Sequence, residues 1–233
     1  MSRRKLLAAS VAGAAVVAGA LIAALALATG GGSKQPAAAP VDGSRVGAML
    51  RGIPQHGAML GSPDAPVTLM EFADPQCPYC AQWAEAALPT IVRRYVRTGK
   101  VRIVFNGLAF VGTDSDAALR TAIAAGQQGR FWNVLELLFE NQGAENSGWV
   151  SDSLLRSIAA AVPGLDAQKM LTERTSLPVE RALVASETFA RESGINSTPS
   201  FAVGRTGGPL RLVTVSTLEP SGLTPSLDAA LGQ

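Results

Sequence analysis

Cysteine is almost absent from this sequence of 233 residues, which contains only Cys77 and Cys80. Two cysteines cannot form the set of disulfides that holds small secreted domains together, and a chain of this length can bury a core without one. Histidine is rarer still, and His56 is the single example. Two thiols and one remote histidine are fewer than the four ligands of a structural zinc site, and they give little support to a Cys–His catalytic pair. We therefore predict no metal ion and no cofactor.

Charged residues are also few. They make up 16% of the chain, and the net charge is +2. The sequence has no stripe of lysine and arginine of the kind that follows a phosphate backbone, so we predict no nucleic-acid partner. Once an apolar N-terminus and a linker are set aside, roughly 175 residues remain, which is the size of one ordinary domain.

The N-terminus combines three cations, at Arg3, Arg4 and Lys5, with an uncharged run over residues 6–29. As a helix at ~1.5 Å per residue this run is about 36 Å long, enough to cross a hydrocarbon core of about 30 Å. Because cations mark the cytoplasmic side, we expect residues 1–5 in the cytoplasm, residues 6–29 as a single transmembrane helix, and everything later outside. The alternative is a cleaved export signal, since residues 2–7 resemble a twin-arginine signal and residues 26–28 offer a cleavage site.

Residues 30–61 contain little that can fill a core. They include a glycine-rich stretch at residues 30–33 and three alanines between two prolines at residues 36–40. We predict a flexible linker over residues 30–61, with His56 in it and outside the core, followed by one folded domain over residues 62–233.

The domain contains short apolar runs bounded by turn residues, which predict strands at residues 67–72, 101–105, 200–203 and 210–214. Apolar residues at spacings of three and four predict helices at residues 78–96, 115–126, 130–141, 151–161, 179–193 and 224–231, and another beginning near residue 166. Pro89 should kink the first of them. This order predicts an α/β fold with a βαβ half, a ββα half and a helical insert of about residues 115–193 between them.

The segment Cys77-Pro78-Tyr79-Cys80 stands where the first strand ends and the first helix begins. A helix N-terminus carries unpaired N–H groups and about half a positive charge, and it stabilises a thiolate there. The pKa of such a thiol can fall from ~8.5 to between ~3.5 and ~7.5. We expect Cys77 to be the exposed attacking sulfur and Cys80, one turn further in, to resolve the mixed disulfide. Two simpler interpretations are half of a zinc site and a chance pair of buried thiols. The sequence has no second C-x-x-C pair to complete a zinc site, and a chance pair does not explain a position between a strand and a helix.

Two segments resemble those of the DsbA-like family, which has the thioredoxin fold. Residues 71–80, Glu-Phe-Ala-Asp-Pro-Gln-Cys-Pro-Tyr-Cys, look like its active-site segment, and residues 196–201, Asn-Ser-Thr-Pro-Ser-Phe, look like the segment with its cis-proline. The likeness runs from residue 67 to the end and includes the helical insert. It implies a thioredoxin-like fold in which Cys77 is the nucleophile, Cys80 the resolving thiol and Pro78-Tyr79 the dipeptide that tunes them.

The resemblance also assigns roles to residues outside the C-x-x-C segment. Thr198-Pro199 would form a cis-proline loop beside the disulfide, with the Thr198 backbone free to pair with an extended substrate strand. Only the resemblance predicts cis here, because about 5–6% of X-Pro bonds are cis. Glu71 matches a buried acid that exchanges protons near the second cysteine, and burial would raise its pKa. The simpler alternative is that Glu71 reaches solvent from the strand end.

Tyr79 is the departure from the strongest oxidases of the family, which carry histidine between proline and the second cysteine. Tyrosine brings a weaker hydrogen-bond donor and no charge, so the direction of electron flow is open. The first hypothesis is an oxidase that donates its disulfide to exported proteins with cysteines and is reoxidised by a membrane redox partner. The second is a reductase or isomerase of the same fold, and the third is a module that binds clients without turnover.

Overall fold

The computed structural model describes residues 40–232. The predicted cytoplasmic residues 1–5, the predicted transmembrane or signal segment 6–29 and the start of the predicted linker lie outside this range. Among residues 40–232, no helix is long and apolar enough to cross a bilayer.

A six-stranded sheet of order β1-β2-β4-β3-β5-β6 forms the centre of the domain. The strands are β1 (Gln55–His56), β2 (Met59–Leu60), β3 (Val67–Ala73), β4 (Val101–Gly107), β5 (Ser200–Arg205) and β6 (Arg211–Val213). Only β3 and β4 run parallel, and the other neighbours are antiparallel. The four predicted strands are found as β3, β4, β5 and β6. The first three are one or two residues longer than predicted and β6 is one residue shorter at each end, whereas β1 and β2 were not predicted.

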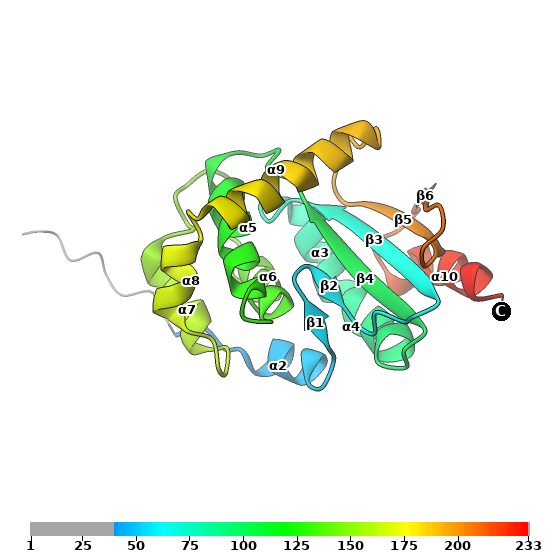
Figure 1. Cartoon of the computed structure of the whole chain (residues 1–233), viewed down its shortest axis with the longest axis horizontal. Coiled ribbons are helices and arrows are strands. Elements are labelled where there is room, and N and C mark those ends of the chain that lie inside the picture. The colour runs from blue at the N-terminus through cyan, green and yellow to red at the C-terminus, as the bar shows by residue number, and fades with distance from the viewer. Residues whose placement is uncertain (1–39, 233) are drawn as a thin grey trace, which may run out of the picture. The chain divides into compact units, whose positions relative to one another are not determined.

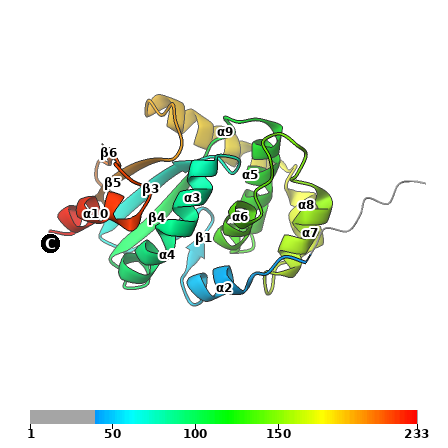
Figure 2. The same cartoon turned by 180° about the vertical axis from the view of Figure 1, so that it is seen from behind.

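Helices cover both faces of the sheet. They are α2 (Ser44–Leu50), α3 (Pro78–Ala86), α4 (Leu88–Ile91), α5 (Thr113–Gly126), α6 (Phe131–Glu140), α7 (Asp152–Ala160), α8 (Ala167–Glu173), α9 (Leu177–Glu192) and α10 (Thr224–Leu231). α9 lies in front of the sheet in Figure 1, while α3, α4 and α10 lie in front in Figure 2, which shows the opposite side. Ring contacts fit this division, since Phe72 of β3 stacks on Phe189 of α9 and Trp83 of α3 meets Phe201 of β5.

The first helix is interrupted, as Pro89 predicts. α3 ends at Ala86, α4 begins at Leu88, and a π-helical turn follows at Val92–Val96. The break lets one apolar face stay against the sheet through all three pieces, with Trp83, Leu88 and Tyr95 buried. The prediction of a βαβ unit is therefore confirmed in outline, with the helix divided near the proline because the ring removes a backbone donor.

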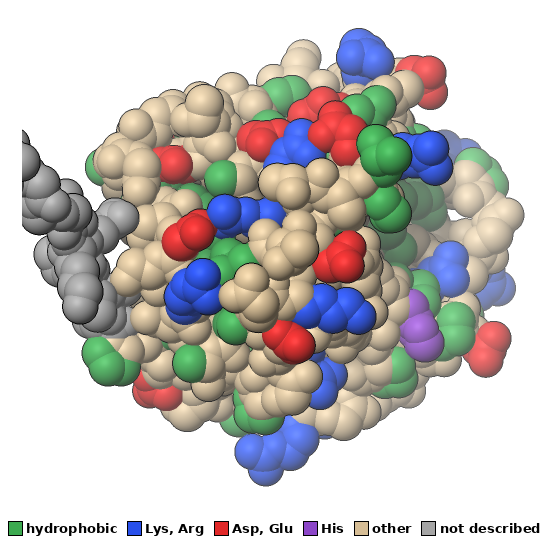
Figure 3. Space-filling view, turned by 60° about the vertical axis from the view of Figure 1, so that its left-hand side comes forward, with side chains coloured by type: hydrophobic (Ala, Val, Ile, Leu, Met, Phe, Trp, Pro, Cys, Tyr) green, Lys and Arg blue, Asp and Glu red, His purple; other side chains and the backbone are tan. Residues whose placement is uncertain are grey.

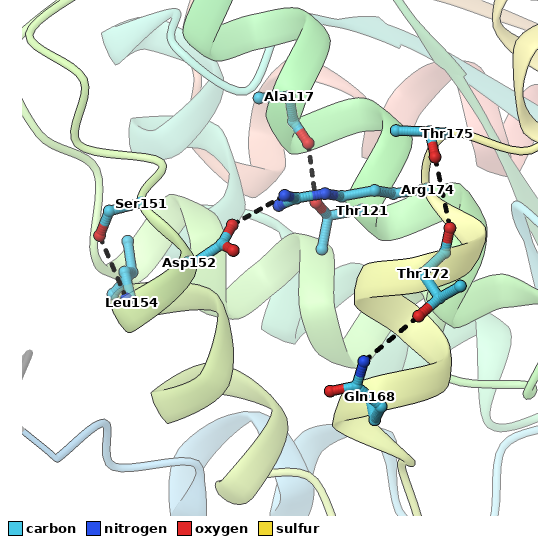
Figure 4. A network of polar contacts seen from close by, with 9 residues as sticks. All are labelled: Ala117, Thr121, Ser151, Asp152, Leu154, Gln168, Thr172, Arg174 and Thr175. Carbon is cyan, nitrogen blue, oxygen red and sulfur yellow. Dashed lines mark hydrogen bonds and ion pairs between the residues drawn. The ribbon is translucent and has the colours of Figure 1, made fainter.

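The helical insert runs from α5 to α9, close to the predicted residues 115–193 (Figure 1). Figure 4 shows how its outer helices are joined, with Arg174 at the end of α8 paired at 2.8 Å to Asp152 at the start of α7. On the face seen in Figure 3, acidic and basic side chains are interspersed, as expected from the small net charge.

The structure differs from the predicted flexible linker over residues 30–61. Within it, α2 buries Val46 and Leu50, and Leu60 of β2 is fully buried and pairs with Ile103 of β4. The linker prediction is therefore wrong for residues 44–60. Glycine and proline in this stretch serve as turns between short elements, and the apolar residues reach the core through contacts with segments that follow much later. His56 is exposed on β1, outside the core as expected.

Candidate active site

The C-x-x-C segment joins the sheet to its first covering helix. β3 ends at Ala73, a short loop follows, and Cys77 is the N-cap residue of α3 with extended dihedral angles (φ −71°, ψ 119°). Pro78 occupies the first helical turn, where the missing N–H leaves no bond unmade. The Cys80 N–H donates to the Cys77 carbonyl at 3.1 Å, which closes the first turn and brings the two side chains together.

The two thiols have opposite electrostatic surroundings. The pKa of Cys77 is lowered to about 6, mainly by a hydrogen bond from Cys80, with further help from the Thr198 side chain and the backbone N–H groups of Cys80 and Tyr79. Desolvation opposes these bonds without overcoming them. The pKa of Cys80 is raised well above its ordinary value by burial, by its bond to Cys77 and by the charges of Cys77 and Glu71. A thiolate beside a protonated thiol is the pair that disulfide exchange requires.

Access to the two sulfurs differs less than the sequence suggests. Cys77 is 7% exposed and Cys80 is 0% exposed, so Cys77 is the reachable sulfur but is not the open one that was expected. Both are free thiols in this structure. Tyr79, which stands between them in the sequence, is 62% exposed.

The loop before β5 lies directly beside Cys77. The Thr198–Pro199 peptide bond is cis, as the family resemblance predicts. The Cys77 thiol donates to the Thr198 carbonyl at 3.4 Å, a contact that crosses from residue 77 to residue 198. The structure thus brings Cys77, Cys80, Thr198 and Pro199 together at one end of the sheet.

Glu71 lies in the middle of β3, paired with Phe105 of β4 and Phe201 of β5. It is 1% exposed, and its Oε2 atom is buried with no hydrogen-bond partner among the described residues. Desolvation raises its pKa to about 8, and its charge acts on Cys80. The alternative in which Glu71 reaches solvent is therefore wrong, because the strand is covered by helices at this point.

A buried polar clamp holds the loop that precedes Cys77. Asp74 is completely buried and accepts three hydrogen bonds, from the Gln76 N–H at 2.8 Å, the Ser115 hydroxyl at 2.5 Å and the Val111 N–H at 2.9 Å. The Asp74 carbonyl accepts from the Cys77 N–H at 3.0 Å. The carboxylate therefore fixes the loop to α5, and the loop fixes the first cysteine.

Gln76 extends this clamp to the loop after α6. Its Oε1 accepts from the Asn146 N–H at 2.7 Å and the Trp149 ring N–H at 3.4 Å, while its Nε2 donates to Asn146 Oδ1 at 3.1 Å. Gly112 allows Asn146 to approach, since a Cβ at Gly112 would clash with the Asn146 side-chain amide. Sequence reasoning missed these residues. The one available signal was two polar residues, Asp74 and Gln76, between a buried strand and the cysteine pair.

Comparisons with known proteins agree with this geometry. A family model described as Thioredoxin matches residues 55–207. A protein of Bacillus cereus named probable disulfide bond formation protein D is 31% identical over 147 residues, which cover 62% of this chain and 68% of the relative. The crystal structure of oxidised BdbD from Bacillus subtilis superposes with a TM-score of 0.66 at 21% identity, covering 78% of this chain and 98% of that one. A thioredoxin-like oxidoreductase from Silicibacter pomeroyi superposes with a TM-score of 0.59 at 31% identity, covering 75% and 92%.

Proposed function

The chain belongs to the DsbA-like thiol–disulfide oxidoreductases of the thioredoxin fold, and we propose that it is an oxidase that passes a Cys77–Cys80 disulfide to exported proteins. The observation that carries this proposal is the contrast between the sulfurs. Cys77 is the reachable one and its pKa is about 6, whereas Cys80 is enclosed and its pKa is raised. Because a sulfur of low pKa leaves easily and its thiolate stabilises the dithiol form, the disulfide is more oxidising than one between two ordinary thiols.

Client oxidation begins when a client thiolate attacks Sγ of Cys77 in the disulfide form. The new bond joins client and Cys77, the Cys77–Cys80 bond breaks, and Cys80 leaves as a thiolate that takes up a proton. A second client thiolate then attacks the client sulfur of the mixed disulfide, and Cys77 leaves as a thiolate. Two electrons have passed from the client, now oxidised, to the protein, now a dithiol. In the reverse direction Cys77 is the attacking nucleophile and Cys80 resolves the mixed disulfide.

Glu71 is the proton donor and acceptor for Cys80 in this scheme. Its carboxyl is buried, is unpaired at Oε2 and has a pKa of about 8, so it holds a proton at neutral pH. A neutral acid near a departing thiolate can give up that proton, and the carboxylate can take one back when Cys80 must attack. The dipeptide Pro78-Tyr79 tunes Cys77 through the shape of the first helical turn and the Tyr79 N–H.

The loop at Thr198 and Pro199 receives the client. The Thr198 carbonyl oxygen lies 3.4 Å from the Cys77 sulfur. An extended client segment that pairs with this backbone would therefore place a client cysteine next to Cys77. Recognition through the backbone suits a protein that accepts many sequences.

The domain acts outside the cytoplasm. Residues 6–29 either anchor it to the membrane or are removed, so that the domain is secreted. The support for this is the cationic start of the chain and the length of the apolar run. A membrane partner that accepts electrons would restore the disulfide after each client.

A reductase or isomerase is the second candidate function, and Tyr79 is the residue that favours it. The tyrosine is largely exposed and brings no positive charge to the Cys77 thiolate. A client-binding module without turnover is the third, and the paired cysteines argue against it. Since ~30 mV corresponds to ~1.4 kcal/mol for two electrons, modest local changes separate the first two.

The deciding experiment is the reduction potential of the full chain at equilibrium with glutathione. A value near about −120 mV supports the oxidase, and a value near about −270 mV supports the reductase. Cys80→Ser should trap mixed disulfides between Cys77 and client proteins, whereas Cys77→Ser should abolish exchange. Exchange that survives Cys77→Ser contradicts the assignment of the attacking sulfur.

A further inference from the structure

A second buried acid, Glu136, lies in α6 on the side of the domain that also carries α3. The run from Phe131 to Phe139 is otherwise uncharged, and Glu136 is 4% exposed within it. α6 packs against α3, the helix that carries Cys80, and the two lie side by side in Figure 2. No hydrogen bond or ion pair holds the Glu136 carboxyl within residues 40–232. A buried acid without a partner costs stability, and such a residue invites a functional explanation.

One side of Glu136 faces a hollow in the surface. This cleft has a volume of ≈350 Å³, and its lining includes Glu136 together with the cleft residues Arg45, Gln82, Glu85 and Glu140. α3 contributes Pro78, Ala81 and Ala84 to the wall, so the cleft reaches the helix turn that contains Cys80. Several water molecules fit in this volume, since each occupies about 30 Å³ of liquid.

Glu136 also lies close enough to Glu71 for the two carboxyl groups to interact electrostatically. Burial, followed by the charge of Glu71, raises the pKa of Glu136 well above its ordinary value, and the charge of Glu71 also acts on Cys80. Glu71 is therefore electrostatically coupled to both residues, while its own Oε2 is sealed from solvent. A proton that reaches Glu71 must cross protein, and Glu136 is the buried acid that both lines the cleft and interacts with Glu71.

We propose that Glu136 relays protons between water in this cleft and Glu71, and so determines how fast Cys80 can gain or lose its proton. The proposal rests on the proposed role of Glu71 in disulfide exchange. Glu136 does not touch the reacting sulfurs. It is therefore a positioning residue, which acts on the reaction only through Glu71.

The steps balance in both directions. When the disulfide opens, the Cys80 thiolate takes a proton from the Glu71 carboxyl, the Glu71 carboxylate takes one from Glu136, and the Glu136 carboxylate takes one from water in the cleft. When Cys80 attacks the mixed disulfide, each transfer runs in reverse and one proton leaves through the cleft. The electrons move only among the sulfurs.

Charges from each packed element surround this path. Arg45 of α2 forms an ion pair with Glu140 of α6 at 2.6 Å, Glu85 is exposed on α3, and Glu71 comes from β3. Glu140 raises the pKa of Glu136 and Arg45 lowers it, so the two members of the ion pair at the cleft rim act in opposite directions. Burial is the main cause that raises the pKa of Glu136 and so favours its protonated form.

The test is single-turnover oxidation of a dithiol peptide by the disulfide form of the full chain. The reaction is run at several pH values between pH 5 and pH 9, and each sample is stopped by rapid acid quenching. Glu136→Gln keeps the side-chain shape but cannot relay, and we expect disulfide opening to slow about tenfold, less than the ~10²–10⁴ of a direct acid–base catalyst. Glu85→Gln, the matched control on the same cleft, should remain within about twofold. The double variant with Glu71→Gln should be no slower than Glu71→Gln alone, because both residues act in one path.

A second measurement separates a relay from a packing role. Glu136→Ala leaves a space that joins the cleft, and formate should enter it and restore the rate as its concentration rises. Formate should not accelerate the Glu85→Ala variant. A merely structural Glu136 predicts no rescue, and absence of rescue overturns the relay.

The outcomes also separate this proposal from the proposed function. If the wild-type chain exchanges disulfides and Cys77→Ser abolishes the reaction, the proposed function stands, and the relay is then judged by Glu136→Gln. A rate for Glu136→Gln within twofold of wild type at every pH overturns the relay alone, as does an unaffected Glu71→Gln. A wild-type chain without exchange overturns both.

Discussion

Replacing Glu71 by glutamine should stabilise the reduced protein at neutral pH while it slows disulfide exchange. Glutamine keeps the volume of the side chain and removes its ionisation. In the folded protein the pKa of Glu71 is about 8, against an ordinary value of 4.5. At pH 7 the native carboxyl therefore keeps a proton that the unfolded chain has released, and folding must recover it.

The size of the effect follows from linkage. Because the native pKa is raised, the native state is fully favoured below about pH 4.5 and loses stability as the pH rises towards 8. Each pH unit in this window lowers the free energy of unfolding by about 1.4 kcal/mol. At pH 7 wild type has therefore lost about 3 kcal/mol of unfolding free energy through Glu71, whereas Glu71→Gln loses none. This figure depends on the unfolded pKa and is the same for any native pKa above 7.

Urea unfolding of both proteins at pH 4, 5, 6, 7 and 8, with all thiols reduced, measures the difference in unfolding free energy. The variant should match wild type at pH 4 and exceed it by about 3 kcal/mol at pH 7. The cysteines are present in both proteins, so their titration cancels in the difference. Glu145→Gln, a substitution at an exposed site, should stay within about 0.5 kcal/mol of wild type at every pH. A difference that does not vary with pH refutes the argument that burial controls Glu71.

Three further outcomes test other contacts. Alkylation of the reduced chain should reveal one thiol, Cys77, that titrates near pH 6, and a midpoint near pH 8.5 speaks against the hydrogen bonds assigned to it. Asp74→Ala removes the acceptor of three donors and should lower the unfolding free energy by at least ~2 kcal/mol in urea, with a loss under ~0.5 kcal/mol ruling out the clamp. Tyr95→Phe removes a 2.7 Å bond to Asp228 of α10 and should cost about 1 kcal/mol in the same assay without changing the exchange rate.

Local patterns were sufficient for much of the fold. The strand at Val67–Ala73 follows from an apolar run between turn residues, and the break near Pro89 follows from the chemistry of proline. The position of Cys77 at a helix N-terminus also follows from neighbours in the sequence. Each of these features depends on residues within one turn or one strand, and for that reason the sequence alone predicts them.

Features that depend on distant contacts could not be predicted in this way. Leu60 pairs with Ile103, and Gln76 bonds to Asn146, across separations that carry no local signal. Glu71 Oε2 is buried without a hydrogen-bond partner because helices from distant parts of the chain cover β3. The family resemblance was needed for the cis bond at Pro199, because no local property of Thr-Pro selects it.

The polar clamp has a consequence for anyone who wishes to transplant this redox motif. Asp74 and Gln76 come from the thioredoxin half, whereas Ser115 and Asn146 come from the insert, so the support of the loop is divided between two segments. Grafting residues 77–80 onto another scaffold would carry the sulfurs and leave their support behind. The smallest portable unit is the loop at residues 74–76 together with its partners at residues 111–149, and the insert is therefore part of the redox module itself.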